Sequence, residues 1–222
     1  MLILLPPSES KSSGTDSKGL NLASLAFADD LDIRRREVLE RYGSEIWQEP
    51  VGNAINIYAG VLYKALDFHS LSNLRKRRAE TELLISSALF GVLRPFDLIP
   101  RYKAKMRGAD WSDVLPGVLN DIEQELIVDC RSSTYATSWR PDPALTVAIR
   151  VFQVKNDERS VITHMSKKYR GELTRALLQS KAPKNGEELL EVARTHFDAE
   201  LSAFDGVHAR NLDLLISADS IS

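Results

Sequence analysis

The stretch MLILLPPSESK, residues 1–11, opens with five apolar residues and then changes at once to prolines, serines, a glutamate and a lysine. The apolar run is typical of a buried strand that opens the fold. It lacks the basic flank of a secretion signal and is too short to span a membrane, so we expect neither. Residues 6–22 have the composition of a loop. A loop directly after a strand is a place where α/β folds commonly hold ligands.

The rest of the chain alternates between helical and strand patterns. Apolar residues at helical spacing predict helices over 29–47, 57–68 and 186–197, and a further helix that starts near Lys167. Apolar runs predict strands over 123–132, 145–154 and 159–166. Residues 82–93 indicate a strand that runs into a turn, with a helix as the alternative. Without internal repeats or a linker, we expect a mixed α/β (α+β) fold in a single compact domain over residues 1–222.

Composition narrows the classes of function. Of the 222 residues, 43% are hydrophobic and 27% are charged, as in ordinary globular proteins, and the net charge is −2. Whole-molecule charge therefore gives no sign of a nucleic-acid partner. Cys130 is the single cysteine, which excludes an internal disulfide and a cysteine-based zinc site and favours a reducing cytoplasm. The histidines lack metal-ligand spacing, and His196 with Asp198 would need further partners. We predict no metal site and no cofactor.

Positive charge gathers in three runs. Residues 94–107 hold five basic residues and one acid, residues 75–82 hold four and two, and residues 167–175 hold four and one. If the runs converge in the fold they form a phosphate-binding cleft, and otherwise they are solvated charges. The third run lies at a helix start, where the dipole disfavours cations unless an anion joins them. It indicates either an anion site or a solvated basic turn.

Four segments carry a family resemblance. They are MLILLPPSESK (1–11), ISSALFGVLRPFDLIPRYKAKM (85–106), IVDCRSSTYATSW (127–139) and HMSKKYRGELTRALL (164–178). In this order they resemble the YaaA family of peroxide-stress proteins. The most specific parts are the run from Phe90 to Leu98 and the Lys-Lys-x-Arg-Gly run from Lys167 to Gly171. The opening is similar to that of a shorter branch of the family, whereas other members open with a Ser-Pro-Ala-Lys type stretch.

The resemblance implies a single mixed α/β domain of YaaA-type topology with a basic cleft and a helix-hairpin-helix element. It also implies DNA binding with little sequence specificity, and protection against hydrogen peroxide by limiting reactive intracellular iron. A helix-hairpin-helix needs a glycine turn whose N–H groups approach a phosphate, and Gly60 and Gly91 are the candidates. The phosphate contacts would come from seven cations: Lys11, Arg94, Arg101, Lys103, Lys167, Lys168 and Arg170.

Aromatic residues near the basic runs have two interpretations. Three tyrosines either stack on unpaired bases or pack in the core, with core packing favoured; they are Tyr58, Tyr63 and Tyr102. We expect three further aromatic residues in the core: Phe90, Trp111 and Trp139. Cys130 lies in an apolar strand candidate, so we expect it to be buried and inert rather than reactive toward peroxide.

An enzyme that binds a nucleotide is the alternative function. Ser8, Glu9, Ser10 and Lys11 lie on the loop after the first strand. There Lys11 would bind a phosphate together with Lys167 and Lys168, and Glu9 would act as acid or base. The sequence has no GxGxxG, Walker A or GxSxG pattern, and no catalytic residue is assigned. A duplex-wide basic groove would favour DNA, whereas a closed polar pocket around Glu9 and Lys11 would favour an enzyme.

Overall fold

The opening apolar stretch forms strand β1 (Leu2–Leu5), and all four of its residues are buried in the computed structural model of the chain. β1 pairs in parallel with β3 (Leu83–Ser87) on one side and with β6 (Ile127–Asp129) on the other. A strand enclosed in this way has to be apolar throughout, which explains the unbroken run. The structure describes residues 1–156, 158–162 and 165–218.

Most of the other strands extend the sheet around β1. Their bounds are β2 (Val51–Asn53), β4 (Gly91–Leu93), β5 (Leu98–Pro100), β7 (Thr146–Lys155), β8 (Glu158–Val161), β9 (Asp198–Leu201) and β10 (Arg210–Ser217). Within the described residues the sheet has eight strands, in the order β4-β3-β1-β6-β7-β10-β9 with β8 paired to β7. The pairs from β3 across to β10 are parallel, and β4, β8 and β9 add to it antiparallel. β2 and β5 form a separate antiparallel pair.

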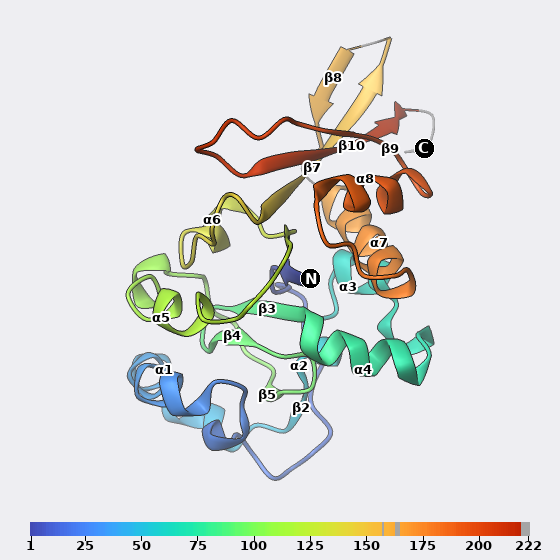
Figure 1. The fold of residues 1–222 in the computed structure, drawn as a ribbon. Helices are drawn as coiled ribbons and strands as arrows, with labels where there is room; N and C mark the ends of the chain where they lie inside the picture. Colours follow the sequence, from blue (N-terminus) through green and yellow to red (C-terminus); the bar gives the residue numbers. More distant parts are fainter. Residues whose placement is uncertain (157, 163–164, 219–222) are drawn as a thin grey trace.

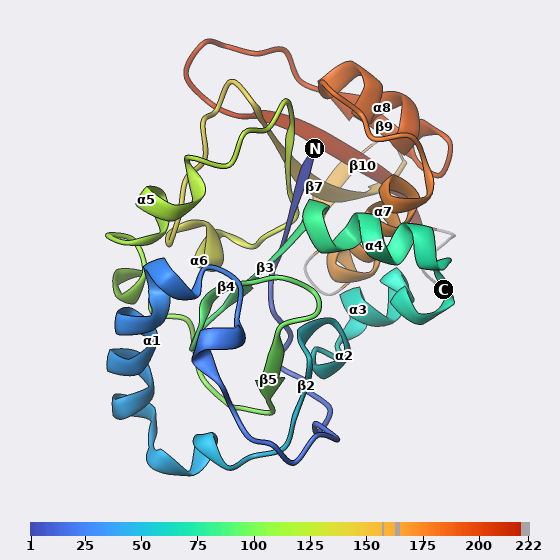
Figure 2. The same cartoon turned by 60° about the horizontal axis from the view of Figure 1, so that its bottom comes forward.

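Helices cover both faces of the sheet. Their bounds are α1 (Ala28–Tyr42), α2 (Ala54–Ile57), α3 (Val61–Leu66), α4 (Asn73–Glu82), α5 (Leu115–Leu119), α6 (Ser133–Ala136), α7 (Ser166–Gln179) and α8 (Gly186–Arg194). In two views α3, α4, α7 and α8 lie on one side of the sheet, and α1 and α5 lie on the other (Figure 1, Figure 2).

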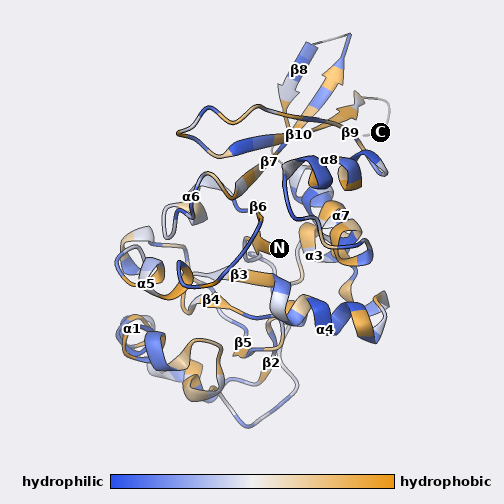
Figure 3. Ribbon diagram, in the orientation of Figure 1, coloured by the Kyte–Doolittle hydropathy of each residue, from blue (hydrophilic) through white to orange (hydrophobic). Residues whose placement is uncertain are grey.

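Hydrophobic residues follow the layers. β3 and β4 are largely hydrophobic, whereas α4 and the exposed strand β8 are largely hydrophilic (Figure 3). The buried apolar side chains form one cluster that extends from Leu2 to Ile216. Because this core is shared by every layer, the chain folds as a single compact mixed α/β domain, as the sequence predicts.

The order of the strands makes β1 the point at which the chain changes direction. From β1 the chain runs to β3 on one side, then crosses to β6 on the other side and continues to β7. Open α/β sheets bind ligands at such a switch point, outside the carboxyl ends of the strands. The loops after β1 (residues 6–11) and after β6 (residues 130–136) leave the sheet at the same edge, because β1 and β6 are parallel. We call this the carboxyl edge and the opposite one the amino edge.

Two predicted helices differ from the structure. The helix predicted over 29–47 ends at Tyr42, because Gly43 takes φ 132°, and a separate 3-10 turn covers Ser44–Trp47. The helix predicted over 57–68 is shorter in the structure, where α3 covers Val61–Leu66 and three residues that end at Gly60 separate it from α2. Gly60 thus lies between two helices.

The predicted strands are present, with one correction at Gly91. The ranges 123–132, 145–154 and 159–166 contain β6, most of β7 and most of β8, and residues 163 and 164 lie outside the described residues. Residues 82–93 form β3 and β4, and Gly91 begins β4 with φ 72°. A Cβ on Gly91 would lie 2.6 Å from the Trp111 ring. Gly91 therefore joins two strands, and the prediction that it is a helix-hairpin-helix turn is wrong.

Helices α3 and α7 cross closely at Gly171. A Cβ on Gly171 would lie 2.2 Å from the backbone oxygen of Leu62 and 3.0 Å from the Cβ of Ala65. Since the nearest atom belongs to backbone, a side chain at this position would force the helices apart. The crossing positions α7, and with it the Lys167 run at its start, against α3.

Gly171→Ala should lower the free energy of unfolding by about 1–3 kcal/mol, because the added methyl group overpacks the crossing. The matched control is Gly117→Ala in α5, where a Cβ has nothing within 4 Å. There alanine should be neutral or stabilising by up to about 1 kcal/mol, because glycine is the poorer helix former. Urea unfolding of both variants measures the difference, and equal stability of the two would contradict the close crossing.

Candidate functional site

The loop after β1 is held in place by the turn before α3. The backbone N–H of Ser12 donates to the oxygen of Ile57 at 2.8 Å, and that of Ala59 donates to the oxygen of Ser10 at 3.0 Å. Lys11 and Tyr58 are thereby paired as an isolated antiparallel bridge. A Cβ on Gly60 would lie 2.2 Å from the Ser8 hydroxyl oxygen. Glycine at position 60 therefore lets the loop carrying Lys11 lie directly against the start of α3.

The Lys11 side chain lies over aromatic rings rather than in open solvent. Its Nζ lies 4.2 Å from the centroid of the Tyr102 ring and 5.5 Å from that of Tyr58, and it donates to the Ser8 backbone oxygen at 2.7 Å. Burial lowers the pKa of Lys11 to about 8, while the Glu9 carboxylate acts in the opposite direction. A larger share of this amine is therefore neutral near physiological pH than of an ordinary lysine.

The rings beneath Lys11 belong to a buried hydroxyl chain. The Tyr58 and Tyr102 hydroxyls lie 2.7 Å apart, and the Ser87 hydroxyl lies 2.9 Å from that of Tyr102. The Tyr63 hydroxyl donates to the Pro6 oxygen at 2.8 Å. Burial raises the pKa of Tyr102 to about 12 and the pKa values of Tyr58 and Tyr63 well above their ordinary value. The three tyrosines are core residues, which confirms the favoured interpretation.

Arg170 fixes the start of α7 to the carboxyl edge. Its guanidinium donates to the backbone oxygens of Cys130 at 3.3 Å, Arg131 at 3.4 Å and Ile149 at 3.0 Å. These oxygens lie on β7 and just after β6, so one side chain ties the helix to two strands. Because these donors bond to backbone oxygens of the sheet, fewer of them remain for a phosphate.

The two lysines at the start of α7 differ in their surroundings. Lys167 is exposed, whereas Lys168 is half-buried, with its Nζ 3.8 Å from a Glu172 oxygen and 5.4 Å from the centroid of the Tyr169 ring. The N-cap residue, Met165, has no side-chain oxygen with which to accept the N–H groups of the first turn.

Arg101 and Lys103 reach the same region through Tyr102. Both are exposed, and they flank Tyr102, whose buried ring lies under Lys11. The Lys103 backbone N–H donates to the Tyr42 hydroxyl at 3.0 Å, which holds this segment against α1. Tyr102 thus reaches Lys11, and the two exposed cations lie next to it in the sequence.

Arg94 lies elsewhere. Its guanidinium donates to the backbone oxygens of Thr81 at 2.6 Å and Leu83 at 3.2 Å, and Leu83 is the first residue of β3. Because β3 is parallel to β1, this position is at the amino edge, on the opposite side from Lys11. Burial lowers the pKa of Arg94, although it remains a cation at physiological pH. The predicted grouping of Arg94 with Lys11 does not occur.

Arg131 and Tyr135 follow β6 at this edge, and sequence reasoning did not single them out. The Arg131 guanidinium donates to both Asp129 oxygens at 2.8 and 2.9 Å and to the Trp139 oxygen at 2.9 Å. Tyr135 lies on α6, and burial together with the Glu9 carboxylate raises its pKa, so its hydroxyl stays protonated. The signal in the sequence for these two residues was their position just after a predicted strand, β6, which is parallel to β1.

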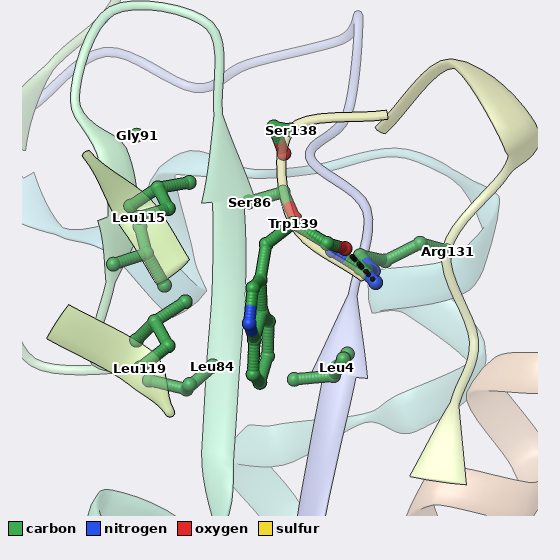
Figure 4. A pocket seen from close by; sticks show the side chains of 10 residues that line it. Leu4, Leu84, Ser86, Gly91, Leu115, Leu119, Arg131, Ser138 and Trp139 are labelled. Atoms are coloured by element: carbon green, nitrogen blue, oxygen red, sulfur yellow. Dashed lines mark hydrogen bonds between the residues drawn. The ribbon is translucent and has the colours of Figure 1, made fainter. Parts of the chain in front are cut away.

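A small cavity lies beneath this edge, on the face of the sheet that α5 covers. Figure 4 shows Trp139 standing between Leu4 and the α5 residues Leu115 and Leu119, with Arg131 bonded to the Trp139 oxygen. The cavity holds about 10 Å³, enough for roughly one water molecule, and Lys11 is not among its lining residues. It is a packing defect of the core and too small for a nucleotide.

In the described ranges, no group of three or more His, Cys, Asp or Glu side chains could hold a metal ion, and no helix is long and apolar enough to cross a membrane. His196 lies instead beside an open hollow of about 290 Å³ between α7 and the end of α8, which Glu172 and Arg175 also line. His164 lies outside the described residues.

Lys11→Met should make the stability less dependent on pH. Between about pH 8 and 10.5 the native chain has lost the Lys11 proton while the unfolded chain still holds it. Wild-type stability should therefore rise with pH across this range, until the unfolded chain also loses the proton. The variant should therefore be the more stable protein at pH 7, with the gap closing by pH 10.5. Urea unfolding across this range tests it, with the exposed Lys18→Met as control. Parallel stability curves for wild type and Lys11→Met would contradict the desolvated amine.

Cys130→Ser should leave intact the peroxide protection that the family resemblance implies. Cys130 is fully buried, as predicted, and burial raises the pKa of its thiol to about 12, so almost no reactive thiolate is present. The measurement is survival of peroxide by cells in which the variant replaces the native protein. Loss of protection by a folded, abundant variant would show that the thiol takes part.

Comparison with known proteins identifies the family of the chain. The family model described as peroxide stress protein YaaA matches residues 32–202. A UPF0246 protein of Streptomyces coelicolor is 34% identical, over 97% of this chain and 98% of its own length. A UPF0246 protein of Corynebacterium glutamicum is 32% identical, over 87% of this chain and 92% of its own length. The chain belongs to the peroxide stress protein YaaA family.

Proposed function

We propose that this member of the peroxide stress protein YaaA family binds DNA in the cytoplasmic response to hydrogen peroxide. It protects DNA by limiting reactive intracellular iron, as the family resemblance implies, and it holds DNA phosphates at the carboxyl edge. The observation that supports the proposal is that most of the cations assigned to this edge lack an acidic partner among the described residues. The assigned cations are Lys11, Arg101, Lys103, Lys167 and Lys168.

Most cations of this group are not neutralised by a carboxylate and can therefore bind an anion. Among the described residues, no carboxylate lies within 4.0 Å of the Lys11, Lys103 or Lys167 ammonium. The surface arginines of the outer strands are paired, for example Arg150 with Asp213 at 2.6 Å. Unpaired cations raise the local positive potential and attract phosphates, which a net charge of −2 does not prevent.

The mode of binding is led by shape. Contacts from lysines and from backbone N–H groups position a phosphate backbone without reading the bases. Gly60, between α2 and α3, is the turn of the helix-hairpin-helix element in this proposal, and it adjoins the Lys11 loop. Arg94 and Arg170 are left out as principal contacts, because both donate to backbone oxygens and Arg94 lies at the amino edge.

A nucleotide-binding enzyme is the second candidate, and one observation favours it. Lys11 is a half-buried amine at the switch point of the sheet, beside Glu9 and Tyr135, and such a group suits chemistry better than simple phosphate binding. A titration with a mixture of nucleotides separates the two functions. Saturable nucleotide binding that competes with DNA would favour the enzyme.

DNA affinity should fall steeply with salt, with a log–log slope of about −0.9 for each phosphate contact. Lys167→Ala with Lys168→Ala should remove two contacts and flatten the slope by roughly 1.8. The matched control changes Lys181 and Lys184, which follow the opposite end of α7. Its slope should equal that of wild type, and fluorescence anisotropy at several salt concentrations measures all three proteins.

Stability should change little in either double variant, by no more than about 0.5 kcal/mol, because these are surface positions. A folded Lys167/Lys168 variant with unchanged affinity and slope would show that these lysines form a solvated turn. Wild-type affinity that is indifferent to salt would remove the DNA-binding proposal.

A further inference from the structure

Lys11 differs from the other cations at the carboxyl edge in a way that phosphate binding does not explain. A lysine that only binds phosphate is best left hydrated and fully charged, as Lys167 is. Lys11 instead lies half-buried over the Tyr102 ring, with one hydrogen bond to the Ser8 oxygen and no carboxylate within ion-pair distance in the described residues. Burial shifts this amine toward its neutral form, which is a nucleophile, whereas the ring contacts and Glu9 favour the cation.

We propose that the Lys11 amine forms an imine with the aldehyde of a phosphorylated deoxyribose, such as the open-chain sugar at an abasic site in DNA. The inference deepens the proposed DNA binding and rests on it for the source of the sugar. The geometry that carries it is a half-buried amine at the carboxyl edge, over the Tyr102 ring, on the edge to which Arg170 also fixes the start of α7. Arg101, Lys103 and the start of α7 would hold the flanking phosphates, and the aldehyde carbon would lie between them at Lys11.

The reaction balances without an oxidant or reductant. The lone pair of the neutral Lys11 Nζ attacks the aldehyde carbon, the new C–N bond forms, and the carbonyl oxygen takes up a proton to give a carbinolamine. Nζ loses one proton as the neutral carbinolamine forms, the protonated hydroxyl then leaves as water to give an iminium, and loss of the second Nζ proton leaves the C=N bond of the imine. The net change is amine plus aldehyde to imine plus water.

Groups for proton transfer come from the elements around the amine, since the Glu9 carboxylate acts on the pKa of both Lys11 and Tyr135. The titratable side chains facing this region are Glu9 on the same loop, Tyr58 before α3, Tyr102 after β5 and Tyr135 on α6. Tyr135 keeps its proton at physiological pH and can give it to the leaving hydroxyl, while the exposed Glu9 carboxylate can accept one. The buried Tyr58 and Tyr102 stay protonated and provide the floor over which the amine lies.

The neutral fraction sets the expected selectivity. With a pKa of about 8, roughly one Lys11 in ten is neutral at pH 7, compared with about one in 2,500 for an ordinary lysine. Lys11 should therefore react about 200-fold faster than exposed lysines of equal access to the aldehyde. The rate should rise with pH and level off near pH 8, well below the pH at which other lysines react fully.

The test traps the imine with cyanoborohydride, which reduces C=N to a stable amine. One arm uses a duplex containing an abasic site, a second uses the intact duplex, and a third uses free 2-deoxyribose 5-phosphate. Peptide mass spectrometry then locates the adduct. We expect a covalent protein–DNA product from the abasic duplex alone of the two duplexes, with the adduct on Lys11.

Two variants complete the design. Lys11→Arg keeps the charge but removes the nucleophile and should lose at least about nine-tenths of the product, given the difference in neutral fraction. Lys18→Arg, on the same loop but exposed, should react as wild type does. If Lys11→Arg does not fold, the position of the adduct in the wild-type protein still decides. An adduct spread over exposed lysines with Lys11 unmodified would overturn the inference.

The arms separate this inference from the proposed DNA binding. Salt-sensitive DNA binding with no adduct on Lys11 in any arm would overturn the inference and leave DNA binding standing. Modification of Lys11 by deoxyribose 5-phosphate in a protein that does not bind DNA would support the inference with a free sugar phosphate as its substrate.

Discussion

The burial of β1 on both faces is the constraint from which the rest of the structure follows. Its four residues lie between β3 and β6 and under helices on each side, so none of them can carry a polar group without a large desolvation cost. Polar side chains can therefore occur only after the strand ends at Leu5. The residues that come next, up to Lys11, emerge at the switch point of the sheet. The same strand that organises the core therefore places the candidate site.

Arginines and lysines have different roles in this fold. Several arginines use their multiple donors on backbone oxygens: Arg78 caps the end of α7, Arg175 caps the end of α3 and Arg170 ties α7 to the sheet. Such bonds satisfy carbonyl groups that helix and strand ends leave without partners. The lysines at the carboxyl edge make fewer bonds of this kind. Counting basic residues along the sequence consequently overestimates the charge that is available to a ligand.

The sequence predicts local structure better than it predicts which residues meet. The strand at Leu2–Leu5, the buried Cys130 and the helix after Lys167 follow from apolar patterns, and the structure has all three. The sequence predicts the ends of helices less well, because Gly43 ends α1 through a backbone conformation that hydrophobic periodicity does not reveal. The separation of Arg94 from Lys11 depends on which edge of a parallel sheet each loop leaves, and spacing along the chain carries no such information. The half-burial of Lys11 likewise needs Tyr102, 91 positions away in the sequence.

The central claim is that ligand binds at the carboxyl edge of the sheet, and amide hydrogen exchange with and without duplex DNA tests it most directly. The account predicts slower exchange on DNA binding in the loop around Lys11, at Gly60 and Val61, and in the first turn of α7. It predicts unchanged exchange at the amino edge, around Thr81 and Lys181. Protection confined to the amino edge, with the Lys11 loop and the start of α7 unaffected, would contradict it.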